Sequence, residues 1–213
     1  MVRVKICGIT SQADALLAVE AGASALGFNF YLPSPRYIAP SHARLIVGEM
    51  PVGVDAVGVF VNPTFEAADE IALTVDLDVV QLHGEEPPGL VEQLSDCWPL
   101  IKAFRVGPEF RAEALAEYGK SVHFFLLDGF SKTARGGTGK TFDWSAAVAA
   151  KRYGRIFLSG GLTPENVGEA IRQVRPFAVD VCSGVESEPG KKDAARVRAF
   201  VEAVEAASKE IAQ

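Results

Sequence analysis

The sequence predicts an α/β fold in which a parallel eight-stranded sheet closes into a (βα)8 barrel. Short apolar segments rich in β-branched and aromatic residues recur eight times along the 213 residues. Between most of them lie segments whose apolar residues recur at three- and four-residue spacing, and this alternation is typical of parallel βαβ units. Eight such units with a final helix fit a closed TIM barrel better than an open doubly wound sheet, and we expect residues 1–213 to form a single domain.

The expected elements follow one another closely along the chain. The expected strands are residues 2–9, 25–30, 56–61, 78–83, 100–106, 123–129, 155–160 and 178–185. The expected helices include residues 12–22, 65–75, 165–174 and the greater part of 191–212. Ser11 and Thr163 stand where helix N-caps are expected, Pro164 suits a first helical position, and Gly22 suits a helix end.

Composition excludes two classes of protein. The formal net charge is −6 and no run of basic residues occurs, so we expect no nucleic-acid partner. No apolar segment is long enough to span a bilayer, and the N-terminus has no apolar signal core, so we expect a soluble cytoplasmic protein without membrane contact. The three cysteines show neither metal-like spacing nor a dense disulfide pattern, so we expect reduced thiols and no metal site.

The stretch 134-ARGGTGKT-141 is similar to the glycine-rich loop that binds nucleotide phosphates. Ala134 stands where that pattern requires a glycine, and the expected N-cap, Asp143, follows Lys140 by three residues, so no helix starts at the lysine. We therefore interpret this stretch as a glycine-rich loop after the sixth strand rather than as a nucleotide site.

Function in a (βα)8 barrel lies at the C-terminal ends of the strands and in the loops that follow them. We expect the non-apolar residues at these positions to converge on one mouth of the barrel; they are Cys7, Arg36, His83, Arg105, Asp128, Gly160, Gly161, Ser183 and Gly184.

Two of these residues are candidates for acid–base chemistry. A lone cysteine in an apolar strand is usually a small buried hydrophobe, but alternation places Cys7 on the same face as Arg3 and Lys5, where a nearby ammonium would favour the thiolate. Asp128 is either a turn or cap residue, as in many Asp-Gly pairs, or a partly desolvated carboxyl at the rim that keeps its proton and acts as a general acid.

Two glycine turns are candidate anion sites. The segments 159-SGGLTPEN-166 and 182-CSGVESEPG-190 follow the seventh and eighth strands, where many barrels bind phosphate through backbone N–H groups. The alternative is that both are ordinary strand-to-helix turns without a ligand. Such turns account for one glycine pair more readily than for two pairs in adjacent βα units.

Other polar residues also point to the mouth. Asp180 faces inward on the eighth strand, which predicts a buried Lys5–Asp180 pair of either structural or functional use. Arg36, in a proline-stiffened loop, is either a surface arginine or a guanidinium that binds a carboxylate bidentately. Gln81 and His83 share the inward face, where His83 can be simply a satisfied polar residue.

Seven short motifs, taken together, resemble one known family. They are 5-KICGIT-10, 30-FYLPSPRY-37, 80-VQLHG-84, 127-LDG-129, 136-GGTG-139, 158-LSGGL-162 and 180-DVCSGVE-186. In this order, and covering essentially the whole chain, they closely resemble the phosphoribosylanthranilate isomerase family of tryptophan biosynthesis, whose members are single (βα)8 barrels.

The resemblance implies an Amadori rearrangement of N-(5-phosphoribosyl)anthranilate to 1-(2-carboxyphenylamino)-1-deoxyribulose 5-phosphate. It implies that Asp128 is the general acid, that Cys7 is the general base, and that Arg36 holds the anthranilate carboxylate. Backbone groups of Gly160, Gly161, Ser183 and Gly184 would hold the phosphate, and the other implied substrate-binding residues are Gln81, His83, Gly136 and Asp180. The loop 130–141 would close over the ligand, and the implied partner is the phosphorylated small molecule alone, bound by a monomer or homodimer without metal or cofactor.

Two other functions are compatible with parts of this pattern. Another phosphate-binding barrel, such as a pentose-phosphate epimerase or a synthase of a phosphorylated indole precursor, would need a different acid–base pair. A metal-dependent epimerase would also need clustered histidines and carboxylates, whereas only three histidines occur and His42 lies in an expected surface helix. A non-catalytic sensor of a phosphorylated aromatic ligand would bind without turnover and would have no use for Cys7 paired with Asp128.

Overall fold

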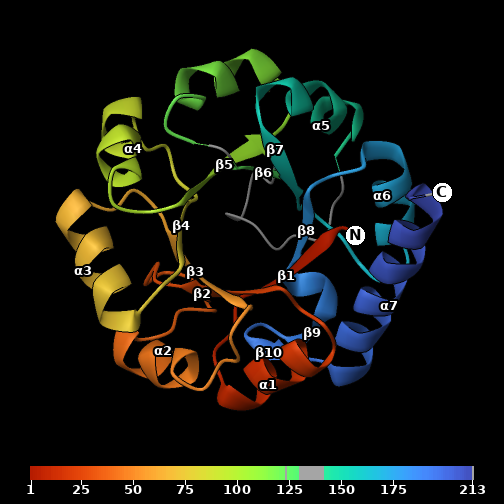
Figure 1. The fold of residues 1–213 in the computed structure, drawn as a ribbon, viewed down its shortest axis with the longest axis horizontal. Coiled ribbons are helices and arrows are strands. Elements are labelled where there is room, and N and C mark those ends of the chain that lie inside the picture. Colours follow the sequence, from red (N-terminus) through yellow and green to blue (C-terminus); the bar gives the residue numbers. More distant parts are fainter. Residues whose placement is uncertain (123, 130–141, 213) are drawn as a thin grey trace.

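The computed structural model describes residues 1–122, 124–129 and 142–212. Its eight parallel strands follow one another around a closed barrel, and β8 pairs with β1 to complete it (Figure 1). The strands are β1 (Arg3–Cys7), β2 (Ala25–Asn29), β3 (Asp55–Phe60), β4 (Val79–Leu82), β5 (Leu100–Val106), β6 (Phe124–Gly129), β7 (Arg155–Leu158) and β8 (Ala178–Val181). Each overlaps an expected strand, so the predicted (βα)8 fold is confirmed.

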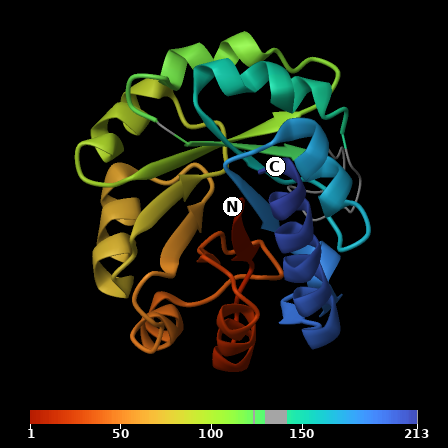
Figure 2. The same ribbon diagram turned by 45° about the vertical axis from the view of Figure 1, so that its right-hand side comes forward.

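The helices surround the barrel as an outer layer, which both ribbon views show (Figures 1 and 2). They are α1 (Gln12–Glu20), α2 (Pro40–Val47), α3 (Phe65–Val75), α4 (Pro88–Ser95), α5 (Ser145–Ala150), α6 (Val167–Val174) and α7 (Ala194–Ile211). Short 3-10 helices are η1 (Ala112–Tyr118), η2 (Lys151–Tyr153) and η3 (Ser183–Val185), and a small antiparallel pair, β9 (Glu186–Glu188) and β10 (Lys191–Lys192), follows η3. The long helix α7 packs against both α1 and α6, which joins the two ends of the outer layer.

The ends of two helices test the capping predictions. The Ser11 hydroxyl accepts a hydrogen bond from the Asp14 amide at the start of α1, and Gly22 has a φ of +106°, which suits the turn after this helix. The prediction for Thr163 and Pro164 is wrong, because α6 begins at Val167. The Asn166 side chain accepts from the Thr163 amide and donates to the Gly161 carbonyl, so residues 163–166 form a turn before the helix starts.

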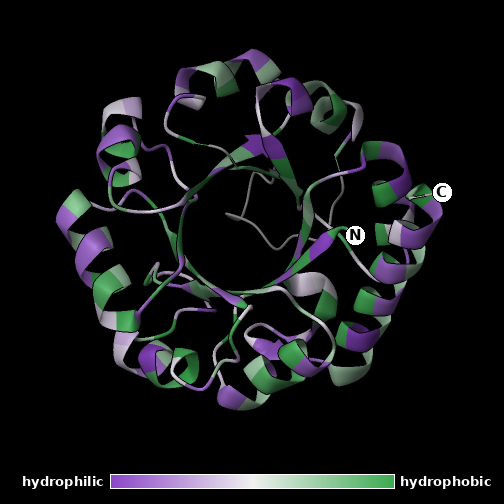
Figure 3. Ribbon diagram, viewed as in Figure 1, coloured by the Kyte–Doolittle hydropathy of each residue, from purple (hydrophilic) through white to green (hydrophobic). Residues whose placement is uncertain are grey.

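The core has two layers, as expected of a barrel. The larger layer lies between the strands and the helices, and α6 buries four residues at helical spacing toward it: Val167, Ala170, Ile171 and Val174. Figure 3 shows hydrophobic and hydrophilic residues alternating along the outer helices accordingly. The smaller layer fills the barrel interior with Ala25, Val57, Ile101, Ala103, Leu126, Phe157 and Ala178. The interior is therefore a packed core, and a ligand is accommodated only above it.

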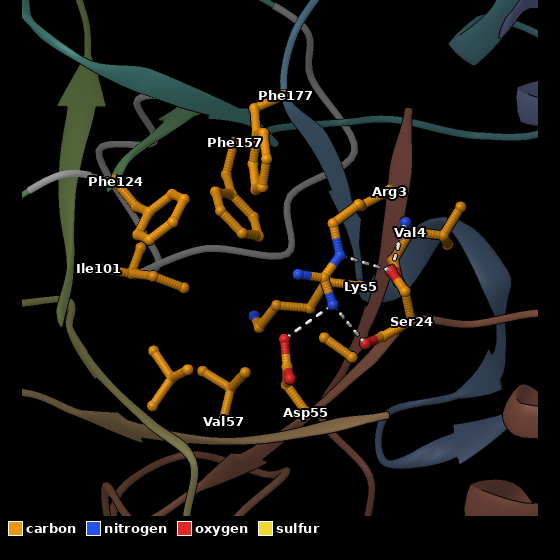
Figure 4. A pocket seen from close by; sticks show the side chains of 12 residues that line it. Arg3, Val4, Lys5, Ser24, Asp55, Val57, Ile101, Phe124, Phe157 and Phe177 are labelled. Atoms are coloured by element: carbon orange, nitrogen blue, oxygen red, sulfur yellow. Dashed lines mark hydrogen bonds and ion pairs between the residues drawn. The ribbon is translucent and has the colours of Figure 1, made fainter. Parts of the chain in front are cut away.

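The N-terminal end of the barrel is closed by side chains (Figure 4). The Arg3 guanidinium donates to an Asp55 oxygen at 2.8 Å and to the Ser24 carbonyl at 3.1 Å. Across the small cavity, the rings of Phe124, Phe157 and Phe177 contact one another, and the cavity holds about 40 Å³. That volume is too small for a substrate, so this end of the barrel serves packing. Across the described ranges, no helix has the length and apolarity that crossing a bilayer requires.

Candidate active site

A cavity of about 600 Å³ opens at the C-terminal ends of the strands. The predicted site residues within the described ranges all line it: Cys7, Arg36, Gln81, His83, Asp128, Gly160, Gly161, Asp180, Ser183 and Gly184. Gly136 and the loop 130–141 lie outside the described residues. Arg105, opposite Asp128 in the strand register, lines a neighbouring cavity of about 690 Å³ that shares His83 with the first. Closure of the sheet thus brings residues from position 7 to position 184 to one mouth.

Below the mouth lies the predicted ion pair inside the barrel. Lys5 on β1 and Asp180 on β8 stand opposite each other in the strand register, and their side chains meet with Nζ and Oδ1 2.7 Å apart. The Ser159 hydroxyl donates to the second Asp180 oxygen at 2.9 Å. Burial by itself lowers the pKa of Lys5, but the carboxylate of Asp180 outweighs this effect and raises it, so the ammonium keeps its charge.

Cys7 is the last residue of β1, one step above Lys5 on the inward face. Its sulfur packs so closely against β2 that a Cβ on Gly27 would lie 2.7 Å from it. A hydrogen bond from the Cys182 thiol lowers the pKa of Cys7 to about 6; burial opposes this shift and the charge of Lys5 adds to it. The predicted lowering by Lys5 is therefore present, but Cys182, which sequence reasoning placed only in a glycine turn, has the larger effect.

Asp128 lies within β6 rather than in a turn or at a helix cap, and its side chain is buried, with 7% of its surface exposed. The imidazole Nε2 of His83 is 3.4 Å from one Asp128 oxygen, and the Gln81 amide nitrogen is 2.9 Å from Nδ1 of the same ring. When the Gln81 amide donates to Nδ1, the ring proton is on Nε2 and points toward Asp128. The Gln81 side chain therefore holds the His83 ring in place, and His83 in turn faces the Asp128 carboxyl.

Arg36, in the loop after β2, is held by a residue that the sequence analysis did not single out. Its Nε and Nη2 atoms donate to the two carboxylate oxygens of Glu186 at 2.9 and 2.7 Å. The hydrogen bonds with Glu186 raise the pKa of Arg36 further, although burial opposes the rise. Glu186 thus uses one N–H of Nε and one of Nη2, which leaves the second Nη2 N–H and the two on Nη1 for a ligand carboxylate.

Glu186 also connects Arg36, through Lys192, to the backbone of Cys7, the candidate catalytic base. The buried Lys192 ammonium is 3.0 Å from Glu186 Oε1 and donates to the Cys7 carbonyl at 2.6 Å. Burial tends to raise the pKa of Glu186, but the hydrogen bond from Arg36 and the charge of Lys192 hold it below the ordinary value. The signal for this network in the sequence is the charged turn 186-ESEPGKK-192, whose partners no local pattern identifies.

The turns after β7 and β8 present backbone amides to the cavity. Gly160 and Gly161 have φ values of +79° and +72°, which only glycine adopts readily. A Cβ on Gly184 would meet the Leu162 carbonyl, so the two turns touch at this glycine. Among the backbone and side-chain oxygens of the described ranges, none accepts a hydrogen bond from the amides of Gly160, Gly161, Ser183 or Gly184. These four donors are suited to an anion that spans both turns.

The fold and the position of this cavity define an enzyme of the (βα)8-barrel class. The sequence model of the family described as N-(5'-phosphoribosyl)anthranilate (PRA) isomerase matches residues 4–203. The chain belongs to this family.

Relatives that carry the same name cover nearly the whole chain. The N-(5'-phosphoribosyl)anthranilate isomerase of Geobacter metallireducens is 51% identical over 201 residues, which are 94% of this chain and 98% of that protein. The crystal structure of phosphoribosyl anthranilate isomerase from Thermotoga maritima superposes with a TM-score of 0.91 at 48% identity and covers 97% of this chain and 100% of that one. A crystal structure of phosphoribosyl anthranilate isomerase in complex with reduced 1-(o-carboxyphenylamino)-1-deoxyribulose 5-phosphate has a TM-score of 0.87 at 46% identity and covers 97% of this chain and 100% of that one.

No group of three or more histidine, cysteine, aspartate or glutamate side chains within residues 1–122, 124–129 and 142–212 is arranged to hold a metal ion.

Proposed function

We propose that this protein catalyses the Amadori rearrangement of N-(5-phosphoribosyl)anthranilate to 1-(2-carboxyphenylamino)-1-deoxyribulose 5-phosphate in tryptophan biosynthesis, acting as one domain of 213 residues. The observation that supports it most strongly is the placement of Cys7 and Asp128 in one cavity, on strands three positions apart in the barrel. The related isomerase structure with a reduced product analogue bound supports the same substrate class.

The first half of the reaction needs an acid. In this proposal the Asp128 carboxyl protonates the ring oxygen of the ribose, the bond from that oxygen to C1 breaks, and the nitrogen lone pair forms a Schiff base at C1. Asp128 lines the cavity and is 5% exposed, so this transfer takes place away from bulk water. His83 and Gln81 keep the carboxyl in place during the transfer.

The second half needs a base. The Cys7 thiolate removes the proton from C2, and the electron pair of that C–H bond forms the C1=C2 double bond of the enolamine. Protonation at C1 with loss of the proton from the C2 hydroxyl then gives the ketone. With a pKa of about 6, Cys7 is largely unprotonated at neutral pH and still basic enough to accept the proton. Acid and base thus come from two different environments, one a buried carboxyl and one a thiolate that Cys182 and Lys5 stabilise.

The two ends of the substrate are anionic and are held apart from the reacting carbons. The four amides of the turns after β7 and β8 would bind the phosphate, and the remaining N–H groups on Nη1 and Nη2 of Arg36 would bind the anthranilate carboxylate. Binding energy from these two ends orients C1 and C2 between Asp128 and Cys7. Asp180, paired with Lys5, forms the floor beneath them. A contact from Gly136 remains a prediction.

The chemistry requires no metal and no organic cofactor, and we propose that the substrate is bound by a monomer or a homodimer. Both forms are described for the isomerase of Thermotoga maritima, where monomers were generated from the dimeric protein.

The decisive test compares turnover with binding. We expect the native protein to consume freshly prepared phosphoribosylanthranilate, followed by the loss of anthranilate fluorescence. Cys7→Ser and Asp128→Asn are each expected to lower kcat by orders of magnitude while product affinity, measured by calorimetry, is kept. Tight binding of the product without turnover by the native protein would instead support a non-catalytic sensor.

A further inference from the structure

The β9–β10 hairpin brings a buried lysine to the end of β1. In the antiparallel register of the hairpin Lys192 stands opposite Glu186, and the Lys192 backbone amide donates to Asp14 Oδ2 at 3.2 Å. The Lys192 side chain is 0% exposed, whereas that of its neighbour Lys191 is 67% exposed. A lysine is taken out of water only where nearby groups satisfy its charge, so the partners of Lys192 indicate its use.

Each of the three N–H donors of the Lys192 ammonium has an acceptor in the protein. Nζ donates to the Cys7 carbonyl oxygen at 2.6 Å and to Glu186 Oε1 at 3.0 Å, and the Cys182 sulfur is 3.9 Å away. An ammonium group has three donors and no acceptor, so none is left for a ligand. Lys192 therefore acts on the site through these partners and does not bind the substrate itself.

The peptide group between Cys7 and Gly8 is held at both of its polar atoms. Its N–H, which belongs to Gly8, donates to the Gly27 carbonyl on β2 at 2.9 Å, and its carbonyl accepts from Lys192. The chain leaves the strand at this point, because Gly8 has a φ of +75°. A change in the orientation of this peptide group would move the Cys7 side chain, since both are attached to the same α-carbon.

The same lysine is linked to the residue that would bind the substrate carboxylate. Glu186 Oε1 accepts from Lys192 Nζ at 3.0 Å and from Arg36 Nε at 2.9 Å, so one carboxylate oxygen bridges the two cations. The three side chains are largely withdrawn from water, which strengthens hydrogen bonds between charged groups. These contacts set the distance between the Arg36 guanidinium and the end of β1.

We propose that Lys192 is a positioning residue of the isomerase: its ammonium, anchored on Glu186, holds the Cys7 carbonyl and so keeps the Cys7 sulfur at a fixed distance from the carboxylate bound at Arg36. The role rests on the proposed function, because Cys7 and Arg36 are the base and the carboxylate anchor of that reaction. A displacement of about 1 Å can lower the rate of a reaction a hundredfold. Loss of Lys192 is therefore expected to affect the chemical step more than substrate binding.

The first test compares Lys192→Met with Lys191→Met. Methionine occupies similar space without a donor or a charge, and Arg36 still neutralises Glu186, so we expect the variant to fold. On the plateau of its pH profile kcat is expected to fall about ten- to a hundredfold with little change in KM. The matched control Lys191→Met removes an exposed pair with Glu188 and is expected to keep the native kcat.

A second variant separates positioning from stability. Lys192→Met combined with Glu186→Gln removes the buried charge on both sides, so we expect it to recover the urea midpoint that Lys192→Met loses. Its kcat is expected to stay well below that of Glu186→Gln alone, because the Cys7 carbonyl still lacks its donor. This comparison also serves if the single variant Lys192→Met fails to fold.

The contact is also measured without substrate. The sequence contains one cysteine–glycine step, Cys7–Gly8, so carbonyl-¹³C cysteine with ¹⁵N glycine gives one nuclear magnetic resonance signal for this peptide group. We expect the carbonyl resonance to move to lower chemical shift in Lys192→Met, because a charged donor is lost, and to stay unchanged in Lys191→Met.

Three results would overturn the positioning role. They are an unchanged resonance or an unchanged kcat in folded Lys192→Met, a loss of kcat that disappears at high pH, which would mean that Lys192 acts only as a charge on the thiol, and recovery of kcat in the double variant. A moved resonance in a protein whose native form shows no turnover would overturn the proposed function and leave the contact between Lys192 and Cys7 established.

Discussion

The side chains of Lys5 and Asp180 form an ion pair at 2.7 Å inside the barrel, directly beneath the cysteine at the end of β1. The Lys5 side chain is fully buried and that of Asp180 is 6% exposed, so the pair is screened from water. Removing one partner leaves an uncompensated charge in the core, and removing both does not. The pair therefore links the stability of the barrel to the electrostatics of the site above it.

Lys5→Met is expected to lower the free energy of unfolding by about 3–5 kcal/mol, because Asp180 is then buried without a cation. Urea unfolding followed by circular dichroism measures this as a lower midpoint at unchanged slope. The double variant Lys5→Met with Asp180→Leu is expected to recover most of the loss. A single variant within about 1 kcal/mol of the native protein would contradict a strongly coupled pair.

The pH dependence of the reaction follows from the thiol of Cys7. Its pKa is lowered to about 6 by the hydrogen bond from Cys182, with the charge of Lys5 adding to the effect. Below this pKa the sulfur carries a proton and cannot accept another, so kcat/KM is expected to rise about tenfold per pH unit up to that value and to level off above it. A steady-state pH profile measures the limb, with Cys97→Ser as the control. An acid limb at about 8.5, where an unperturbed thiol titrates, would show that Cys7 is not held as a thiolate.

Glu186 is expected to act on substrate binding through Arg36. Glu186→Gln removes the charge that fixes the guanidinium and Lys192, so we expect KM to rise about tenfold with a smaller effect on kcat. Glu188→Gln is the matched control, because Glu188 lies two residues away in an exposed pair with Lys191 and such pairs contribute little. Equal KM values for the two variants would contradict the role of Glu186.

The Cys7 sulfur depends on the absence of a side chain at Gly27. Gly27→Ala would place a methyl group 2.7 Å from that sulfur, and we expect kcat to fall by about ten- to a hundredfold because the base is displaced. Gly89→Ala is the control: Gly89 lies in α4, and a Cβ there would have no neighbour within 4 Å. Activity of Gly27→Ala comparable to that of Gly89→Ala would mean that the sulfur has room to move without loss of function.

The turn after β7 is expected to be intolerant of any side chain. Gly160 has a φ of +79°, and a Cβ there would meet the backbone of Gly129 and lie 3.1 Å from the carbonyl carbon of Asp128. Gly160→Ala should therefore raise KM through the phosphate site and lower kcat through Asp128. Gly53→Ala shares the backbone strain, with a φ of +97°, but has no neighbour within 4 Å. Steady-state kinetics and the affinity for inorganic phosphate are measured for both variants. Similar losses of activity and phosphate affinity in both would indicate that backbone strain, and not contact with the site, is the cause.

Local patterns were sufficient to predict the barrel and most of the residues around its mouth. Apolar periodicity predicted eight strands, and alternation along β1 and β8 predicted the Lys5–Asp180 pair, because both signals depend only on neighbouring residues and on closure of the sheet. The start of α6 was predicted too early, since the Asn166 side chain stabilises a turn that competes with the helix. Arg105 lies at the predicted end of the barrel, opposite Asp128, but lines an adjoining cavity, because strand position predicts the end of the barrel and not the direction of a long side chain.

The sequence by itself determined the closed barrel, the end at which its site lies, and through motif resemblance the family to which the chain belongs. Only the tertiary structure decided that Cys182 lowers the pKa of Cys7 and that Glu186 occupies two donors of Arg36. These contacts join positions more than a hundred residues apart, and they depend on side-chain rotamers in a closed space. Periodicity repeats over a few residues and contains no information about which rotamers meet across the barrel, so the network that tunes the site becomes visible only when the chain is folded.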